Sequence, residues 1–127
     1  MARSVLLQLA RDSITEVIEA KRLINKNALL SEYPLLAQSV ATGVNIYLNG
    51  ELRGSAHSDA TEKSLLEDLV YNAKKAAFEN PRYSPITTSE YIDSEVEVVL
   101  YTPDGEMRER DPSLFATNRE KFSIHLE

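Results

Sequence analysis

Apolar residues recur at three- and four-residue steps in two parts of the chain. They are Val5, Leu6, Leu9, Ala10, Ile14, Val17 and Ile18 in the first part, and Leu65, Leu66, Leu69, Val70, Ala73, Ala76 and Ala77 in the second. An α-helix turns once in about 3.6 residues, so each set lies along one helical face. We therefore predict an amphipathic helix over residues 3–22, and a second one that starts at a capping box of Asp59 and Glu62 and ends at Phe78.

Alternation of apolar and polar residues predicts a β-hairpin in the middle of the chain. The apolar members of the alternating run are Val44, Ile46 and Leu48. They lead into Asn49-Gly50, a dipeptide that adopts the positive φ angles of a two-residue type I′ turn. Residues 51–55 are therefore predicted to return antiparallel to the first strand.

A second alternating run, residues 95–101, predicts a strand with one polar face. Val96, Val98 and Leu100 are expected to face the core, and the Thr-Pro-Asp-Gly sequence after them predicts a turn into a partner strand around Met107. Residues 121–127 alternate again and predict a terminal strand, preceded by a short helix that Asp111-Pro112 caps.

Two stretches lack a regular period and are predicted to be irregular. Residues 27–43 contain Pro34, and we expect there a connection with one short helical turn. Residues 79–91 contain Pro81 and Pro85, which hold the chain extended in an ordered loop.

The order of these elements predicts an α+β fold, in which helices pack on a mainly antiparallel sheet. The chain has 127 residues, the usual size of one domain, and we treat residues 1–127 as a single domain. Its composition, 43% hydrophobic and 27% charged, is typical of a globular protein. The inward-facing residues expected to meet in one core are Leu52, Leu66, Leu69, Phe78, Val96 and Val98.

Composition and charge narrow the function classes. The net charge of −6 and the pI near 5.0 disfavour binding to nucleic acid or to an anionic membrane surface. The chain has no cysteine, which excludes disulfides, Cys-ligated metals and a thiol nucleophile, and its two histidines, His57 and His125, are too few for a histidine metal site. We expect no metal and no cofactor. No apolar run has the length of a signal peptide or a membrane span, so we expect a cytoplasmic protein.

The densest group of candidate functional residues follows the hairpin turn, in the sequence Leu-Arg-Gly-Ser-Ala-His-Ser-Asp at residues 52–59. An arginine offers a planar fork for phosphate or carboxylate, a glycine allows close backbone approach, and the helix predicted to follow presents free N–H groups. We interpret this region as a small-anion site, to which a proline-flanked loop adds an arginine and an aromatic ring. The predicted ligand-binding residues are Arg53, Gly54, Ser55, His57, Ser58, Arg82 and Tyr83.

Other interpretations of the same residues stay open. The residues between the turn and the helix cap can be structural, with Arg53 paired with Glu51 or Glu97, Tyr83 buried as a plug and Arg82 paired with a carboxylate. Ser55, His57 and Asp59 are the residue types of a nucleophilic triad, but neighbours on one strand project in parallel and do not converge. Asp93, Glu95 and Glu97 are predicted to share a strand face, where a solvated ladder is a better interpretation than a cation site.

Four segments of the chain, in order, resemble the signature blocks of the AMMECR-one domain family. They are LLQLARDSI (6–14), GVNIYLNGELRG (43–54), NAKKAAFENPRYSPIT (72–87) and EVEVVLYTP (95–103). The resemblance implies an α/β fold with a sheet flanked by helices and no settled activity. It also implies Memo-like or radical-SAM partner proteins, which are often encoded beside family members.

The chain departs from the family pattern in two respects. Ser55, Ala56 and His57 stand where the family usually has Cys-Ile-Gly, and family members usually continue further, so the chain resembles a short form. We expect a binding or accessory module with a small-anion site. The alternative is an enzyme or enzyme subunit in which Arg53, His57 and Arg82 hold and protonate an anionic metabolite or act on RNA. Because residues 122–126 or their neighbour would leave an unpaired strand edge, we also expect a homodimer.

Overall fold

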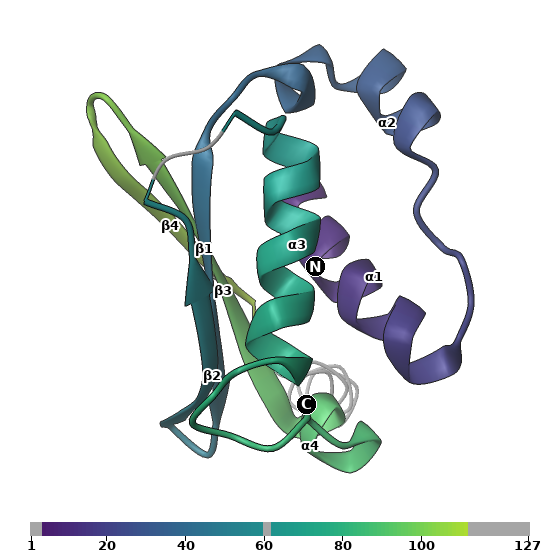
Figure 1. The fold of residues 1–127 in the computed structure, drawn as a ribbon, viewed down its shortest axis with the longest axis vertical. Coiled ribbons are helices and arrows are strands. Elements are labelled where there is room, and N and C mark those ends of the chain that lie inside the picture. Colours follow the sequence, from purple (N-terminus) through teal and green to yellow (C-terminus); the bar gives the residue numbers. More distant parts are fainter. Residues whose placement is uncertain (1–3, 60–61, 112–127) are drawn as a thin grey trace, which may run out of the picture.

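The computed structural model describes residues 4–59 and 62–111, and it places helices on one face of a four-stranded antiparallel sheet (Figure 1). The elements are α1 (Val5–Glu19), α2 (Lys26–Glu32), the 3₁₀ helix η1 (Pro34–Ala37), β1 (Ala41–Leu48), β2 (Glu51–His57), α3 (Leu65–Phe78), α4 (Thr88–Asp93), β3 (Ser94–Thr102) and β4 (Gly105–Asp111). The strand order is β2-β1-β3-β4. The predicted α+β fold, a mainly antiparallel sheet with helices packed on it, is confirmed.

Both long helices begin at a serine whose side chain satisfies a free backbone N–H group. The Ser4 hydroxyl accepts a hydrogen bond from the N–H of Leu7 at the start of α1, and the Ser64 hydroxyl accepts one from the N–H of Glu67 at the start of α3. The predicted cap at Asp59 is therefore wrong. Ser64 and Glu67 have the same spacing as the rejected pair, and they stand directly before the apolar stripe, where the helix can bury it.

The two irregular stretches contain more regular structure than the sequence predicts. Residues 27–43 include most of α2, all of η1 and the start of β1. The loop predicted for residues 79–91 ends early, because Thr87 and Glu90 form a capping box that starts α4.

The predicted turns are confirmed. Asn49 and Gly50 have φ angles of 54° and 81°, and Leu48 pairs with Glu51 across them. A strand also forms around Met107, because Gly105, with a φ of 123°, allows the chain to turn back after β3. The helix and strand predicted after Asp111 lie outside the described residues, so the strand edge and the homodimer inferred from them stay predictions.

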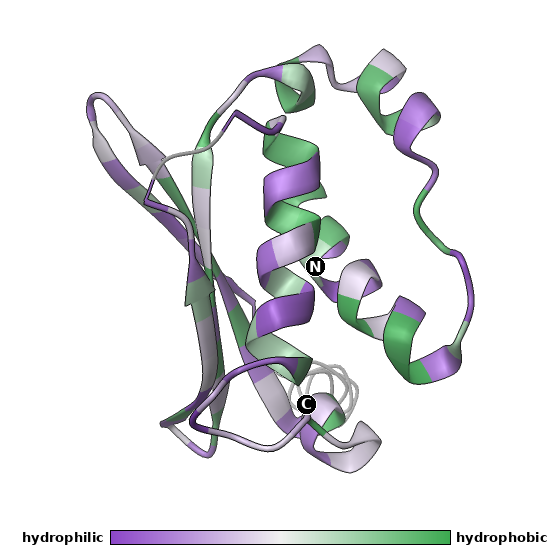
Figure 2. Ribbon diagram, in the orientation of Figure 1, coloured by the Kyte–Doolittle hydropathy of each residue, from purple (hydrophilic) through white to green (hydrophobic). Residues whose placement is uncertain are grey.

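The core lies between the sheet and the helices, with α3 against β1 and β2 and α1 against β3. Hydrophobic and hydrophilic residues alternate around α3 (Figure 2), as expected for a helix that buries one side. Of the predicted core residues, Leu66, Leu69, Val96 and Val98 are buried and Phe78 packs at the border. Leu52 is 41% exposed, so its placement in the core is wrong. It pairs with Tyr47 across the hairpin, and paired residues share one face of a sheet.

We call the sheet face opposite α1 and α3 the outer face.

None of the helices in residues 4–59 and 62–111 has the length and the apolar character that spanning a membrane requires.

Candidate functional site

A β-bulge separates Arg53 from the regular pairing of the hairpin. Tyr47 pairs with Leu52 and Ile46 pairs with Gly54, so Arg53 is the extra residue on β2. A bulge changes the direction in which a side chain leaves the sheet. Here it brings the guanidinium group to α4 and to the loop before α4, where it donates hydrogen bonds to Glu90 and to the carbonyl oxygen of Pro85.

The fork of Arg53 holds the carboxylate of Glu90. Arg53 Nε lies 3.0 Å from Glu90 Oε2, and Arg53 Nη2 lies 3.0 Å from Glu90 Oε1 and 3.4 Å from the carbonyl oxygen of Pro85. The guanidinium carbon lies 5.8 Å from the ring centre of Tyr83, close enough for a cation–π contact. The side chain of Arg53 is 13% exposed. The predicted alternative partners Glu51 and Glu97 are therefore wrong, because the bulge directs Arg53 away from both.

The contact with Arg53 lowers the pKa of Glu90. The hydrogen bonds from Arg53, followed by the bond from the N–H of Thr87, lower the pKa of Glu90 from 4.5 to about 2. Glu90 thus serves two purposes, because the carboxylate oxygen that closes the capping box of α4 also accepts from Arg53. The bidentate bond ties the hairpin to α4.

Gly54 faces the helices and lies against α3. A Cβ atom at this position would lie 2.1 Å from the carbonyl oxygen of Ala76. Only a residue without a side chain allows this approach. The close contact that the sequence suggested for a ligand is made by a helix of the same chain.

Ser55 belongs to a row of hydrogen-bonded side chains on the outer face. The Ser55 hydroxyl donates to Asn45 Oδ1 at 2.7 Å, and Asn45 Nδ2 donates to Glu97 Oε1 at 2.8 Å. The same carboxylate oxygen accepts from the Tyr47 hydroxyl at 3.5 Å and from Arg108 Nη1 at 3.2 Å. We call Asn45, Tyr47, Ser55, Glu97 and Arg108 the outer row.

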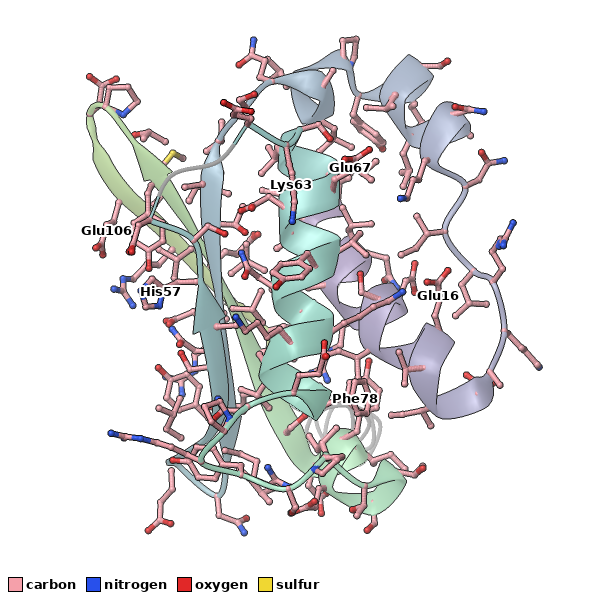
Figure 3. All side chains as sticks on the ribbon, in the orientation of Figure 1. Glu16, His57, Lys63, Glu67, Phe78 and Glu106 are labelled. Carbon is pink, nitrogen blue, oxygen red and sulfur yellow. The ribbon has the colours of Figure 1, made fainter. Side chains whose placement is uncertain are left out.

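His57 lies beside the outer row but does not join it. Its ring meets the ring of Tyr101 edge to face at 6.5 Å, and His57 Nε2 lies 3.5 Å from the exposed carboxylate of Asp59. Figure 3 shows His57 and Glu106 on the side of the sheet away from α3. The Ser55 hydroxyl donates to Asn45 rather than to His57, so these residues do not form a triad.

Ser58 points to the other side, into a buried polar cluster beneath α3. The carboxylate of Asp68, 1% exposed, accepts from the Thr42 N–H at 2.8 Å, the Thr42 hydroxyl at 2.7 Å, the Ser58 hydroxyl at 2.9 Å and Asn72 Nδ2 at 3.2 Å. All four donors are neutral. We call Thr42, Ser58, Asp68 and Asn72 the inner cluster, and its contacts fix α3 against β1 and the end of β2.

The fold therefore divides the predicted site residues. Arg53 and Tyr83 lie together, Ser55 and His57 lie on the outer face, and Gly54 and Ser58 face α3. Arg82 is exposed; its N–H donates to Asn80 Oδ1, and it forms no ion pair among the described residues.

Sequence reasoning missed Glu90, Asp68 and Asn72. Asp68 and Asn72 interrupt the apolar stripe of α3 at four-residue spacing, which marks a buried polar pair. Glu90 stands three residues after Thr87, the spacing of a capping box, but nothing local shows that it meets Arg53. Asp93 lies in α4, so its predicted place on the strand face of Glu95 and Glu97 is wrong. Within residues 4–59 and 62–111, no three acidic or histidine side chains gather as a metal site requires.

Comparisons with known proteins agree with the fold. The family model described as AMMECR1 matches residues 7–121. The crystal structure of the uncharacterized protein PH0010 from Pyrococcus horikoshii is similar, with a TM-score of 0.67 and 26% sequence identity. The match covers 77% of this chain and 50% of that one, so the chain spans half the length of that protein. The curated proteins gave no match.

Proposed function

The chain belongs to the AMMECR1 family, and we propose that it acts as a binding or accessory module rather than as an independent enzyme. The observation that carries this proposal is the outer row. Its side chains hold one another in place on a sheet face that α1 and α3 leave uncovered. A surface whose polar groups are already fixed loses less conformational entropy when a partner binds.

The chemistry of the outer row suits a protein partner with mixed polar groups. Glu97 is nearly buried and balanced by Arg108, which is half-exposed and also contacts Glu106 at 2.8 Å. Half of the Arg108 side chain is exposed, so an acidic group of a partner can reach it while Glu97 and Glu106 hold it in position. A Memo-like or radical-SAM protein, the partner class that the family resemblance implies, is the proposed partner, and a cytoplasmic location is part of the same proposal.

The enzyme alternative has less support in this arrangement. Catalysis by Arg53, His57 and Arg82 needs side chains that meet at one reacting atom. Arg53 contacts Glu90, His57 contacts Tyr101, and Arg82 is exposed on a separate loop. Each of the three therefore has a different environment.

Binding of the chain to a co-expressed Memo-like or radical-SAM protein tests the proposal, with the dissociation constant measured by calorimetry. Arg108→Ala is expected to weaken binding about tenfold, the loss typical of an interfacial arginine. The matched control is Lys21→Ala, which should leave affinity unchanged. Lys21 is an exposed cation just after α1 and lies 3.8 Å from the carboxylate of Glu19. Equal loss in both variants, or no binding to either protein class, would contradict the proposal.

A small-anion site at Arg53 is the second candidate function, and one observation favours it. The fork of Arg53 already holds a carboxylate in bidentate geometry beside Tyr83. An external phosphate or carboxylate has to displace Glu90, so Glu90→Gln, which weakens the internal partner, is expected to increase affinity for phosphate. Thermal-shift titrations of wild type, Glu90→Gln and Arg53→Gln with phosphate test this. The candidate fails if phosphate stabilises wild type and both variants equally.

A further inference from the structure

A pocket of about 800 Å³ lies on the helical side of the molecule, away from the outer face. Its walls are the C-terminal half of α1, the middle of α3, the segment that joins α1 to α2 and the start of α2. Its lining includes Glu16, Arg22, Leu23, Lys26, Val70 and Lys74. This volume is within the range of about 300–1,000 Å³ that small-molecule sites occupy.

Glu16 holds the pocket in shape. Glu16 Oε2 accepts from the N–H groups of Leu23 and Ile24 at 2.9 and 3.0 Å, and Glu16 Oε1 accepts from Lys74 Nζ at 3.0 Å. Burial opposes ionisation of Glu16, but these hydrogen bonds outweigh it and keep the pKa of Glu16 below its usual value. Figure 3 shows Glu16 between α3 and the joining segment, where one carboxylate fixes two walls together.

The charge of the pocket is opposite to that of the whole chain. Arg22, Lys26 and Lys74 line the pocket together with a single carboxylate, that of Glu16, in a chain whose net charge is −6. Lys74 is already paired with Glu16, whereas Arg22 and Lys26 form no ion pair in the part of the chain that the structure describes. Two cations are thus available to an anion from solution.

Apolar side chains lie next to these cations. Leu23 and Val70 line the pocket, and Leu23 is 44% exposed. A smaller adjoining hollow shares Glu16, Arg22 and Lys74 and adds Val17, which is 46% exposed. Large apolar side chains left in water beside free cations would gain from an apolar ligand group that covers them.

From these contacts we propose that this pocket binds an organic anion, a phosphate or carboxylate that carries a short apolar group. Arg22 and Lys26 hold the anionic group, and Leu23 and Val70 contact the apolar part. Because Glu16 already holds the joining segment in place, ligand binding loses little conformational entropy through ordering of that segment. The pocket and the outer row lie on different sides of the sheet. Ligand binding in the pocket and partner binding at the outer row can therefore be tested independently.

Calorimetry with three probes tests the amphipathic character of the site. Hexyl phosphate carries both groups, inorganic phosphate lacks the apolar group, and hexanol lacks the charge. Hexyl phosphate is expected to bind about tenfold more tightly than either of the others, because it uses both parts of the pocket. Equal affinity for hexyl phosphate and inorganic phosphate, or for hexyl phosphate and hexanol, would overturn the proposal.

Variants of the lining residues locate the binding. The double variant Arg22→Gln and Lys26→Gln is expected to weaken hexyl phosphate binding about tenfold, while Lys75→Gln, on α3 but outside the lining, should leave it unchanged. Leu23→Glu provides a second variant at an exposed position and is expected to abolish binding by repelling the anion. If the double variant and Leu23→Glu both bind as wild type does, the proposal is wrong.

Co-sedimentation with phosphatidylglycerol vesicles distinguishes a lipid headgroup from a free ligand as the source of the same chemistry. Binding of wild type but not of Leu23→Glu to the vesicles would assign the pocket to a lipid. Hexyl phosphate binding without vesicle binding would assign it to a free metabolite.

Discussion

A hydrogen-bonded carboxylate lies on each side of the sheet, Asp68 of α3 on one side and Glu97 of β3 on the other, and their surroundings differ. Asp68 in the inner cluster accepts four hydrogen bonds from neutral donors and is 1% exposed. Glu97 in the outer row is 9% exposed and has a cation, the half-exposed Arg108, among its partners. The partners of Asp68 are enclosed by the packing of α3, whereas half of the Arg108 side chain is exposed and can be reached by another protein. We infer that the inner cluster maintains the fold and that the outer row is available for binding.

Packing on the inner face is expected to give the largest effect. Leu69 is fully buried between α3 and the sheet, and Leu69→Ala should lower the free energy of unfolding by about 2–5 kcal/mol by leaving a cavity. Urea denaturation measures this loss. Ile92→Ala, at a residue 42% exposed, is the control and should change stability by less than about 0.5 kcal/mol. An unchanged midpoint for Leu69→Ala would contradict the packing described for α3.

Substitutions at two glycines compare the packing on the two faces of the sheet. In Gly54→Ala the new methyl group meets the backbone carbonyl of Ala76 at 2.1 Å, so α3 and β2 must separate. We expect a loss of about 1–3 kcal/mol. In Gly43→Ala the methyl group meets the hydroxyl of Tyr101 at 2.9 Å on the outer face, and this side chain can move aside. Thermal unfolding of the two variants should therefore show a clearly larger loss for Gly54→Ala, and equal losses would show that the faces are packed alike.

Acid titration tests the ion pair between Arg53 and Glu90. The pKa of Glu90 is about 2 in the folded protein and 4.5 ordinarily, so the folded state favours the charged form. The stabilisation is therefore fully present above about pH 4.5 and is lost as the pH falls toward 2. Glu90→Gln should remove this part of the pH dependence, measured by urea unfolding between pH 5 and pH 2, whereas Glu51→Gln should not. Identical pH profiles for wild type and Glu90→Gln would contradict the pairing with Arg53.

Local signals in the sequence were sufficient for the hairpin turn and for the buried stripe of α3. Asn49-Gly50 determines its own backbone angles, and the helical period of α3 is independent of its neighbours. The bulge at Arg53 is not predictable from local signals. The residue next to it, Gly54, lies against Ala76, a contact between segments far apart in the chain.

The candidate site was harder to predict for the same reason. The sequence predicts that the hairpin and the loop at residues 79–87 lie close together, and Arg53 does lie near Tyr83. Its carboxylate partner, Glu90, lies 37 residues away in the sequence. It belongs to a short helix in a stretch where Pro81 and Pro85 predict an extended loop. Alternation along β2 showed that Ser55 and His57 share a face, but whether that face is covered depends on where the helices pack.

The most direct test of the account is to compare the unfolding free energies of Asp68→Ala and Glu97→Ala by urea denaturation at neutral pH. Asp68→Ala leaves the buried N–H of Thr42 without its acceptor, and the loss should be about 1–3 kcal/mol. Glu97→Ala leaves donors that can reach water, and the loss should stay below about 1 kcal/mol. Equal losses, or a larger loss for Glu97→Ala, would contradict the division between a structural inner cluster and an outer row that is free to bind.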